Sequence, residues 1–250
     1  LTPITTRRLP VLLIMGILVT AAIIFYQRMD GRGETHQITI VNVGSVSRNE
    51  LGRQLRTIIS HNPEIIGFDI LFNQDSLDRD SVLAAVLQRY HRTAQVVTLH
   101  KFNEELYMWD SLEASHPKFP TSTIGFANIS LKDSVLIPAV PMQQIWKDSL
   151  ISPFALAIAK QLGRVNPLYA EGGFGFIEFT LTPDAANYNR IELSDIVSGD
   201  YRKVELEGKI VLLGYLGPKE DFLYLDEKKT QRVSGIEVHA ALLNQVLSRP

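Results

Sequence analysis

Cysteine is absent from the 250-residue sequence. Its absence excludes thiolate metal sites, cysteine nucleophiles and disulfide frameworks together. An excess of charge of either sign is also missing, because 25 lysines and arginines stand against 27 aspartates and glutamates, for a formal net charge of -2. These charges are interspersed, and neither a basic stripe nor an RNP-like aromatic motif occurs. The sequence therefore predicts no nucleic-acid partner.

The short motifs of common enzyme classes are missing as well. No G-x-G-x-x-G joins a strand to a helix, and no G-x-S-x-G nucleophile elbow occurs. The glycines from Gly208 to Gly217 lack the Lys-Ser/Thr pair of a phosphate loop. The six histidines show no i, i+4 pairing of the kind that holds a metal ion on a helix. The sequence therefore predicts no catalytic residue, no metal site and no cofactor.

The longest hydrophobic run stands near the start of the chain, from Leu9 to Tyr26. It carries no charge, and Arg7 and Arg8 precede it. A helix that crosses a bilayer needs about 17–25 apolar residues, and flanking positive charge marks its cytoplasmic end. The alternatives are a buried helix of a soluble domain and a signal peptide, although no small-residue cleavage site follows. We predict a cytoplasmic stub at residues 1–8, a membrane helix at 9–28 and an extracytoplasmic domain at 31–250.

The first part of that domain alternates strands with helices. Runs rich in β-branched or other apolar residues predict strands at 37–43, 64–72 and 95–99. Between them, helical periodicity predicts helices at 47–60 and 81–90. Strand–helix–strand alternation at this spacing is typical of βαβ units and a parallel sheet. The predicted fold is a three-layer α/β sandwich with a mostly parallel central sheet, preceded by one N-terminal transmembrane helix.

The rest of the chain is less regular. Residues 103–123 are expected to form a long irregular excursion, Pro138 and Pro141 limit any regular strand around them, and 214–233 are expected to form a loop. Ser47 with Glu50, and Ser234 with Glu237, match the capping-box pattern at the start of a helix. Further strands are predicted at 124–130, 174–181, 187–193 and 210–213, and further helices at 154–162 and 234–247.

Polar residues follow the predicted strands at the points where these end. They are Asn42 after the first strand, Asn73 and Asp75 after the second, and Tyr215 and Asp221 after the last. Open α/β sheets bind ligands at the carboxyl ends of their strands, so these residues are ligand-binding candidates. Strand ends are polar in every fold of this kind, and ordinary loop residues are the alternative interpretation.

Two further candidates lie inside apolar segments. Asp69 interrupts the second strand, and a buried carboxylate must be paired or hydrogen-bonded. It contacts either a ligand or a nearby backbone group. His239 stands among apolar residues of the last helix, as a buried imidazole or as a pH-sensing group. A hydrolase that uses Asp69 and Asp221 is another hypothesis, and it requires these two carboxylates to share one pocket.

Several segments together resemble the CHASE2 domain. They occur in the order of that family and span nearly all of the chain from Gln37 to Leu247: PEIIGFDILF, the helix start at Asp80, GFANIS, SPFALAIA, GKIVLLGYLG and SGIEVHAALLNQVL. Two features depart from the family pattern. The segment from Lys132 to Pro138 lacks the usual arginine, and no Thr-Pro follows Asp221.

The resemblance implies a non-catalytic sensory domain of a bacterial transmembrane receptor. Such a domain lies on the periplasmic or extracellular side of the cell inner membrane and detects a small-molecule or protein stimulus. It is coupled to a cytoplasmic output domain, in the same chain or in a partner, and further membrane helices are expected after Pro250. The resemblance also implies a homodimer formed through the receptor. The alternative hypothesis is a stand-alone envelope protein that binds a partner or acts as a scaffold.

Overall fold

The computed structural model describes residues 37–73, 80–170, 173–181, 188–216 and 222–247. The predicted membrane helix from Leu9 to Tyr26 lies outside these residues. Within them, no helix is both long and apolar enough to cross a membrane. The chain divides into two units, and the second, Ile38–Pro250, contains the folded α/β domain.

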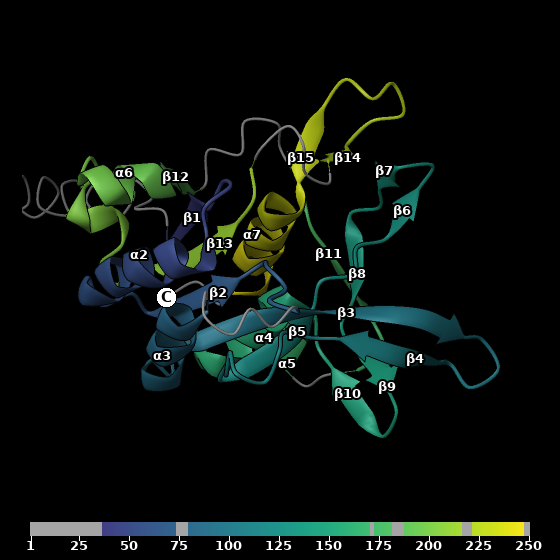
Figure 1. Ribbon diagram of the computed structural model, residues 1–250. Coiled ribbons are helices and arrows are strands. Elements are labelled where there is room, and N and C mark those ends of the chain that lie inside the picture. The colour runs from purple at the N-terminus through teal and green to yellow at the C-terminus, as the bar shows by residue number, and fades with distance from the viewer. Residues whose placement is uncertain (1–36, 74–79, 171–172, 182–187, 217–221, 248–250) are drawn as a thin grey trace, which may run out of the picture. The chain divides into compact units, whose positions relative to one another are not determined.

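The main sheet of this domain has nine strands and is mixed (Figure 1). Its strands run in the order β10-β9-β4-β3-β2-β13-β1-β12, with β5 also paired to β3. The bounds of these strands are β1 Ile38–Asn42, β2 Ile65–Phe68, β3 Thr93–Asn103, β4 Met108–Glu113, β5 Thr123–Phe126, β9 Gln144–Trp146, β10 Ser149–Ile151, β12 Asn189–Glu192 and β13 Ile210–Gly214.

The predicted parallel sheet forms the inner part of this larger sheet. Strands β12, β1, β13, β2, β3 and β5 all pair in parallel. Almost every residue of β1, β2 and β13 is buried. Burial on both sides suits a parallel sheet that helices cover on both faces, and it explains the unbroken apolar runs in the sequence.

Helices cover both faces of the sheet. On one face α2 (Arg48–Ser60), α3 (Ser81–Arg89) and α6 (Leu193–Ser198) close one apolar core around Leu55 and Phe68. On the other face α4 (Phe154–Gln161) and α7 (Gly235–Val246) close a second core around Phe154 and Leu243. The short α5 (Pro167–Ala170) and the 3₁₀ turn η1 (Lys203–Glu205) complete the described helical elements.

The expectation of an irregular excursion at 103–123 was wrong in its first half. Strand β3 continues to Asn103, and β4 returns antiparallel to it, with Phe102 opposite Trp109 and their rings 5.2 Å apart. The side chain of Asn103 accepts hydrogen bonds from the backbone N–H groups of Glu105 and Leu106, which turns the chain. This turn lacks the Asn-Gly or Asp-Gly pair of a two-residue hairpin. The local sequence therefore does not predict a hairpin here.

Two other expected elements differ from the structure. The predicted strand at 174–181 shortens to β11 (Phe176–Glu178), which pairs with β8 (Ala139–Pro141) outside the main sheet. The expected loop at 214–233 contains β14 (Phe222–Tyr224) and β15 (Arg232–Ser234). These two strands form a small sheet with β6 (Leu131–Lys132) and β7 (Val135–Leu136). Such short pairings depend on contacts between distant segments and leave almost no local periodicity.

The two predicted capping boxes have different outcomes. At the start of α7 the Glu237 carboxylate accepts a hydrogen bond from the Ser234 N–H at 2.9 Å, as predicted. At the start of α2 the Ser47 hydroxyl accepts from the Glu50 N–H, but the Glu50 carboxylate accepts from Arg53 and Gln54 instead of reaching back. The second half of that box is therefore not formed.

Candidate functional site

The carboxyl ends of β1, β2 and β13 meet at one edge of the sheet, as their parallel register requires. A narrow cleft of about 100 Å³ opens there between the β1–α2 loop and the segments that follow β2 and β13. Gly44, Arg48, Phe72 and Tyr215 line it. Of the predicted ligand-binding residues, Tyr215 therefore lies directly at this cleft.

Asn42 lies at the same edge, and protein groups occupy its amide. Its Nδ2 donates to Glu192 Oε2 at 2.8 Å, and its Oδ1 accepts from the Leu216 N–H at 3.0 Å and from the Gly44 N–H at 3.3 Å. These bonds join the end of β1 to β12 and to the loop after β13. Asn42 thus positions the loops around the cleft.

Asn73 is directed toward the antiparallel part of the sheet instead. Its Nδ2 donates to Glu113 Oε1 on β4 at 2.6 Å. This hydrogen bond lowers the pKa of the Glu113 carboxyl, and a second one from His100 acts in the same sense. The structure therefore does not place Asn73 with Asn42 and Tyr215. The predicted residues Asp75 and Asp221 lie outside the described residues.

Asp69 and His239 come together at the carboxyl edge, on the face that α7 covers. Asp69 follows β2 directly, and its Oδ1 lies 3.7 Å from Nε2 of His239. The Asp69 side chain is 18% exposed and the His239 side chain 4%. This separation exceeds hydrogen-bonding distance, so the contact is electrostatic. On the histidine side, Nδ1 of His239 is buried and has no hydrogen-bond partner among the described residues. The hydrogen bonding of this buried pair is therefore incomplete.

Burial controls the protonation of this pair. It raises the pKa of the Asp69 carboxyl, and the interaction with His239 opposes that effect. Burial also lowers the pKa of the His239 imidazole, which the Asp69 carboxylate opposes. The rings of His239 and of Phe154 on α4 meet edge to face, with centroids 5.4 Å apart. The pair therefore joins the sheet edge to both helices of this face.

The comparison with protein families gives a match over almost the whole chain. The profile of the CHASE2 domain matches residues 30–250, which include all the segments that carry the resemblance in sequence. The chain belongs to the CHASE2 domain family. This is a family of sensory domains, so the match supports a role in sensing. No curated protein and no solved structure matches the chain.

One ion cluster of this CHASE2 domain was missed from sequence. Asp80, at the start of α3, is completely buried, and its Oδ2 lies 3.0 Å from Arg48 Nη1 and 3.3 Å from Lys118 Nζ. The Arg48 guanidinium also lies 5.8 Å from the Phe72 ring and 5.7 Å from the Phe119 ring. These contacts fix Arg48 in the wall of the cleft. In the sequence this cluster appears only as a single aspartate before a helix. That pattern does not reveal which cations from distant segments approach the aspartate.

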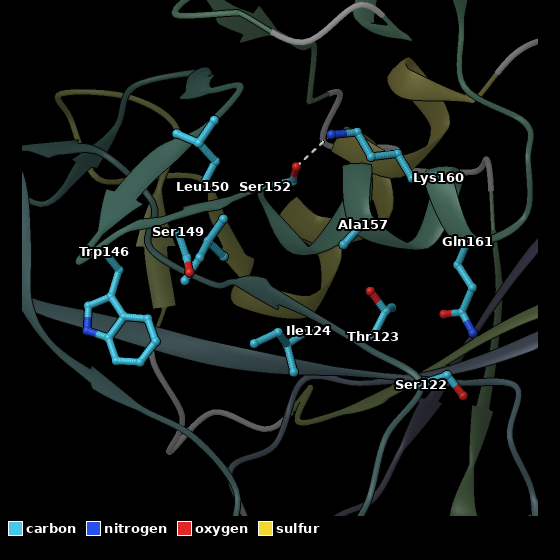
Figure 2. A pocket seen from close by; sticks show the side chains of 11 residues that line it. Ser122, Thr123, Ile124, Trp146, Ser149, Leu150, Ser152, Ala157, Lys160 and Gln161 are labelled. Atoms are coloured by element: carbon cyan, nitrogen blue, oxygen red, sulfur yellow. Dashed lines mark hydrogen bonds between the residues drawn. The ribbon is translucent and has the colours of Figure 1, made fainter.

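The largest cavity that we describe in this CHASE2 domain was also missed, because it lies away from the carboxyl ends of the central strands. It has a volume of about 600 Å³ and lies between β5, β10 and α4 (Figure 2). None of the predicted ligand-binding residues lines it. Within the described part of the chain, no three His, Asp or Glu side chains are grouped closely enough to hold a metal ion.

Proposed function

We propose that this chain is the extracytoplasmic sensory domain of a bacterial membrane receptor, anchored in the inner membrane by the helix from Leu9 to Tyr26. The family match over residues 30–250 carries this proposal. The uncharged run and the preceding Arg7 and Arg8 support the anchor and its orientation. In this proposal the domain binds a stimulus without catalysis and passes the signal to a cytoplasmic output domain, within a receptor homodimer.

The path of the chain through the domain supports attachment to the membrane at both ends. Strand β1 starts at Ile38, at the amino edge of the parallel strands. Helix α7 starts at the opposite edge, where a Cβ built on Gly214 would lie 2.6 Å from Ile236 Cδ1. It ends back at the amino edge, since the Val246 carbonyl accepts a hydrogen bond from the Asn166 N–H at 2.8 Å, and Asn166 is close in sequence to Arg164.

Arg164 identifies that edge. Its Nη1 lies 2.8 Å from Glu64 Oε2, and Glu64 directly precedes β2. The bond between Asn166 and Val246 therefore places the end of α7 beside the beginning of β2. The domain begins and ends at one edge, and its cleft opens at the opposite edge. In the proposed placement this cleft therefore opens away from the membrane-facing edge.

The mechanism that fits this geometry is a population shift. A ligand that binds one arrangement of the domain more tightly moves the equilibrium toward that arrangement. Because β1 begins and α7 ends at the same edge, a change in their relative position would reach both membrane attachments. The differential affinity of the ligand sets the size of the shift.

The absence of cysteine allows a direct test of the orientation. Asp200→Cys at an exposed site of the domain and Thr5→Cys before the hydrophobic run each introduce a single thiol. In intact bacterial spheroplasts, a membrane-impermeant maleimide should label Asp200→Cys, and it should label Thr5→Cys only after permeabilisation. Labelling of Thr5→Cys alone in intact spheroplasts, or recovery of the chain without membranes, would refute the proposed placement.

The sensory role requires its own test in the complete receptor. Deletion of the domain should abolish the dependence of the output on its stimulus, while the output domain stays folded and active. Unchanged stimulus dependence after the deletion would rule out sensing by this domain.

A further inference from the structure

The cavity beside β5 is formed where two strand pairs diverge. On one side β5 pairs with β3 along its whole length. On its other side the Phe126 N–H donates to the Ser152 carbonyl at 3.0 Å, and a parallel bridge joins Phe126 to Pro153. Strand β10 pairs instead with β9 and leaves the earlier part of β5 uncovered. The resulting space of about 600 Å³ is within the range of small-molecule sites.

The uncovered part of β5 offers backbone hydrogen-bonding groups. Successive residues of a strand direct their backbone N–H and C=O groups to opposite neighbouring strands. The backbone groups of Ile124 therefore point away from β3, to the same side as those of Phe126. On that side the Phe126 N–H donates to the Ser152 carbonyl, but the Ile124 backbone groups have no backbone partner there among the described residues. Ile124 is also 42% exposed and lines the cavity. The backbone N–H and C=O groups of Ile124 are therefore available to a ligand in the cavity.

The lining of the cavity favours negative charge. It contains Lys160, at the C-terminal end of α4, and no aspartate or glutamate. Lys160 Nζ lies 2.8 Å from Ser152 Oγ, and no described carboxylate lies within ion-pair distance of it. Figure 2 shows the Lys160 amine directed toward Ser152 and the Thr123 hydroxyl directed into the space between β5 and α4. A cation with several hydroxyl groups and no acid is a suitable partner for a carboxylate or a phosphate.

The opposite wall is apolar and aromatic. Trp146 lines it, and Lys147 Nζ lies 4.8 Å from the centre of its ring, which adds a second cation close to the cavity. Leu150 is 58% exposed and also lines the cavity, although a side chain of this size is usually buried. An apolar or aromatic ligand group would cover these surfaces.

We propose that this cavity binds a small organic anion. Its carboxylate or phosphate group contacts Lys160 and the neighbouring hydroxyls, and its apolar part packs against Trp146 and Leu150. The inference rests on the proposed function in one respect, since binding would be the stimulus that the domain detects. Helix α4 packs against α7. Binding at the end of α4 would therefore affect the position of α7, which returns to the membrane-facing edge.

A fluorescence titration tests the site directly. The chain contains two tryptophans, so Trp109→Phe leaves Trp146 as the only one. The full chain in detergent is titrated with phenylacetate, phenyl phosphate and the neutral phenylacetamide. Saturable changes in Trp146 emission should occur with at least one of the two anions, and which anion binds distinguishes a carboxylate from a phosphate site. Phenylacetamide should bind at least about tenfold more weakly.

Variants of the lysine complete the test. Lys160→Gln should weaken anion binding by at least about tenfold, Lys160→Arg should retain most of it, and Lys132→Gln at an exposed site on β6 should leave it unchanged. Absence of saturable binding of both anions at about 10 mM, or equal binding by Lys160→Gln, would overturn the inference. Neither result affects the proposed sensory placement, which the maleimide labelling tests separately.

Discussion

Arg48 Nη1 and Asp80 Oδ2 lie 3.0 Å apart, although 32 residues separate them in the chain. Asp80 is completely buried, whereas the Arg48 side chain is 25% exposed where it lines the carboxyl-edge cleft. Lys118 approaches the same carboxylate oxygen. The buried acid therefore holds two cations beside a ligand-accessible edge, and it ties α2, α3 and the segment after β4 together.

Asp80→Ala should reduce the free energy of unfolding by about 3 kcal/mol, because it leaves Arg48 and Lys118 without their shared counter-charge. For a domain of this size the midpoint of thermal unfolding should fall by roughly 6–12 °C. Glu207→Ala is the control, because it breaks only the exposed pair with Lys203 and should change stability by less than about 0.5 kcal/mol. Equal midpoints for the two variants would show that the buried cluster contributes no more to stability than the exposed ion pair.

Gly125→Ala should destabilise the domain by about 1–3 kcal/mol through overpacking. A Cβ at Gly125 would lie 2.4 Å from Phe154 Cα and 2.7 Å from its backbone nitrogen, so β5 and α4 would have to separate. Gly173→Ala provides the matched control, since a Cβ there meets no heavy atom within 4 Å. Denaturant titrations of both variants measure the difference. A wild-type midpoint for Gly125→Ala would contradict the close packing of β5 on α4.

Glu237→Ala should cost about 2 kcal/mol, because its carboxylate accepts hydrogen bonds from both the N–H and the hydroxyl of Ser234 and pairs with Arg190. Glu50→Ala should cost no more than about 0.5 kcal/mol, since Glu50 bonds only to neighbours on its own helix. Thermal unfolding of the two variants compares a closed capping box with an open one. Similar losses for both would mean that closure of the box is unimportant.

The pH dependence of stability should contain a contribution from His239. Its pKa is lowered in the folded domain, so below about pH 6.5 the unfolded chain binds a proton that the folded domain does not. Stability due to this residue is therefore present above that pH and falls as the pH decreases. Asp69 has the opposite sign, because its raised pKa favours the folded domain at low pH and this benefit is lost as the pH rises.

Urea unfolding between pH 7.5 and 5.5 measures this contribution. His239→Gln should reduce the loss of stability on acidification by up to about 1.4 kcal/mol per pH unit. His91→Gln, at an exposed site, should leave the slope as it is in the wild type. If His239→Gln has the wild-type slope, protonation of His239 is not linked to unfolding.

One part of the site could be predicted from sequence, and other parts could not. The proximity of Asn42 to the loop after β13 follows from parallel strands whose carboxyl ends share an edge. The pairing of Asn73 with Glu113 was not foreseen, because it depends on the β3–β4 hairpin. Likewise, apolar periodicity in α7 indicates that His239 is buried but does not identify Asp69 as its neighbour.

The sequence by itself determined the strands and helices of the central parallel sheet, the cap of α7 and membership of the CHASE2 family. Periodicity, turn residues and caps are encoded within a few neighbouring residues, so these features can be read locally. Only the tertiary structure decided the extension of β3 into the antiparallel strands, the cations around Asp80 and the cavity beside β5. Each of these arises where segments distant in the chain meet or diverge, and their separation depends on the packing of the whole domain.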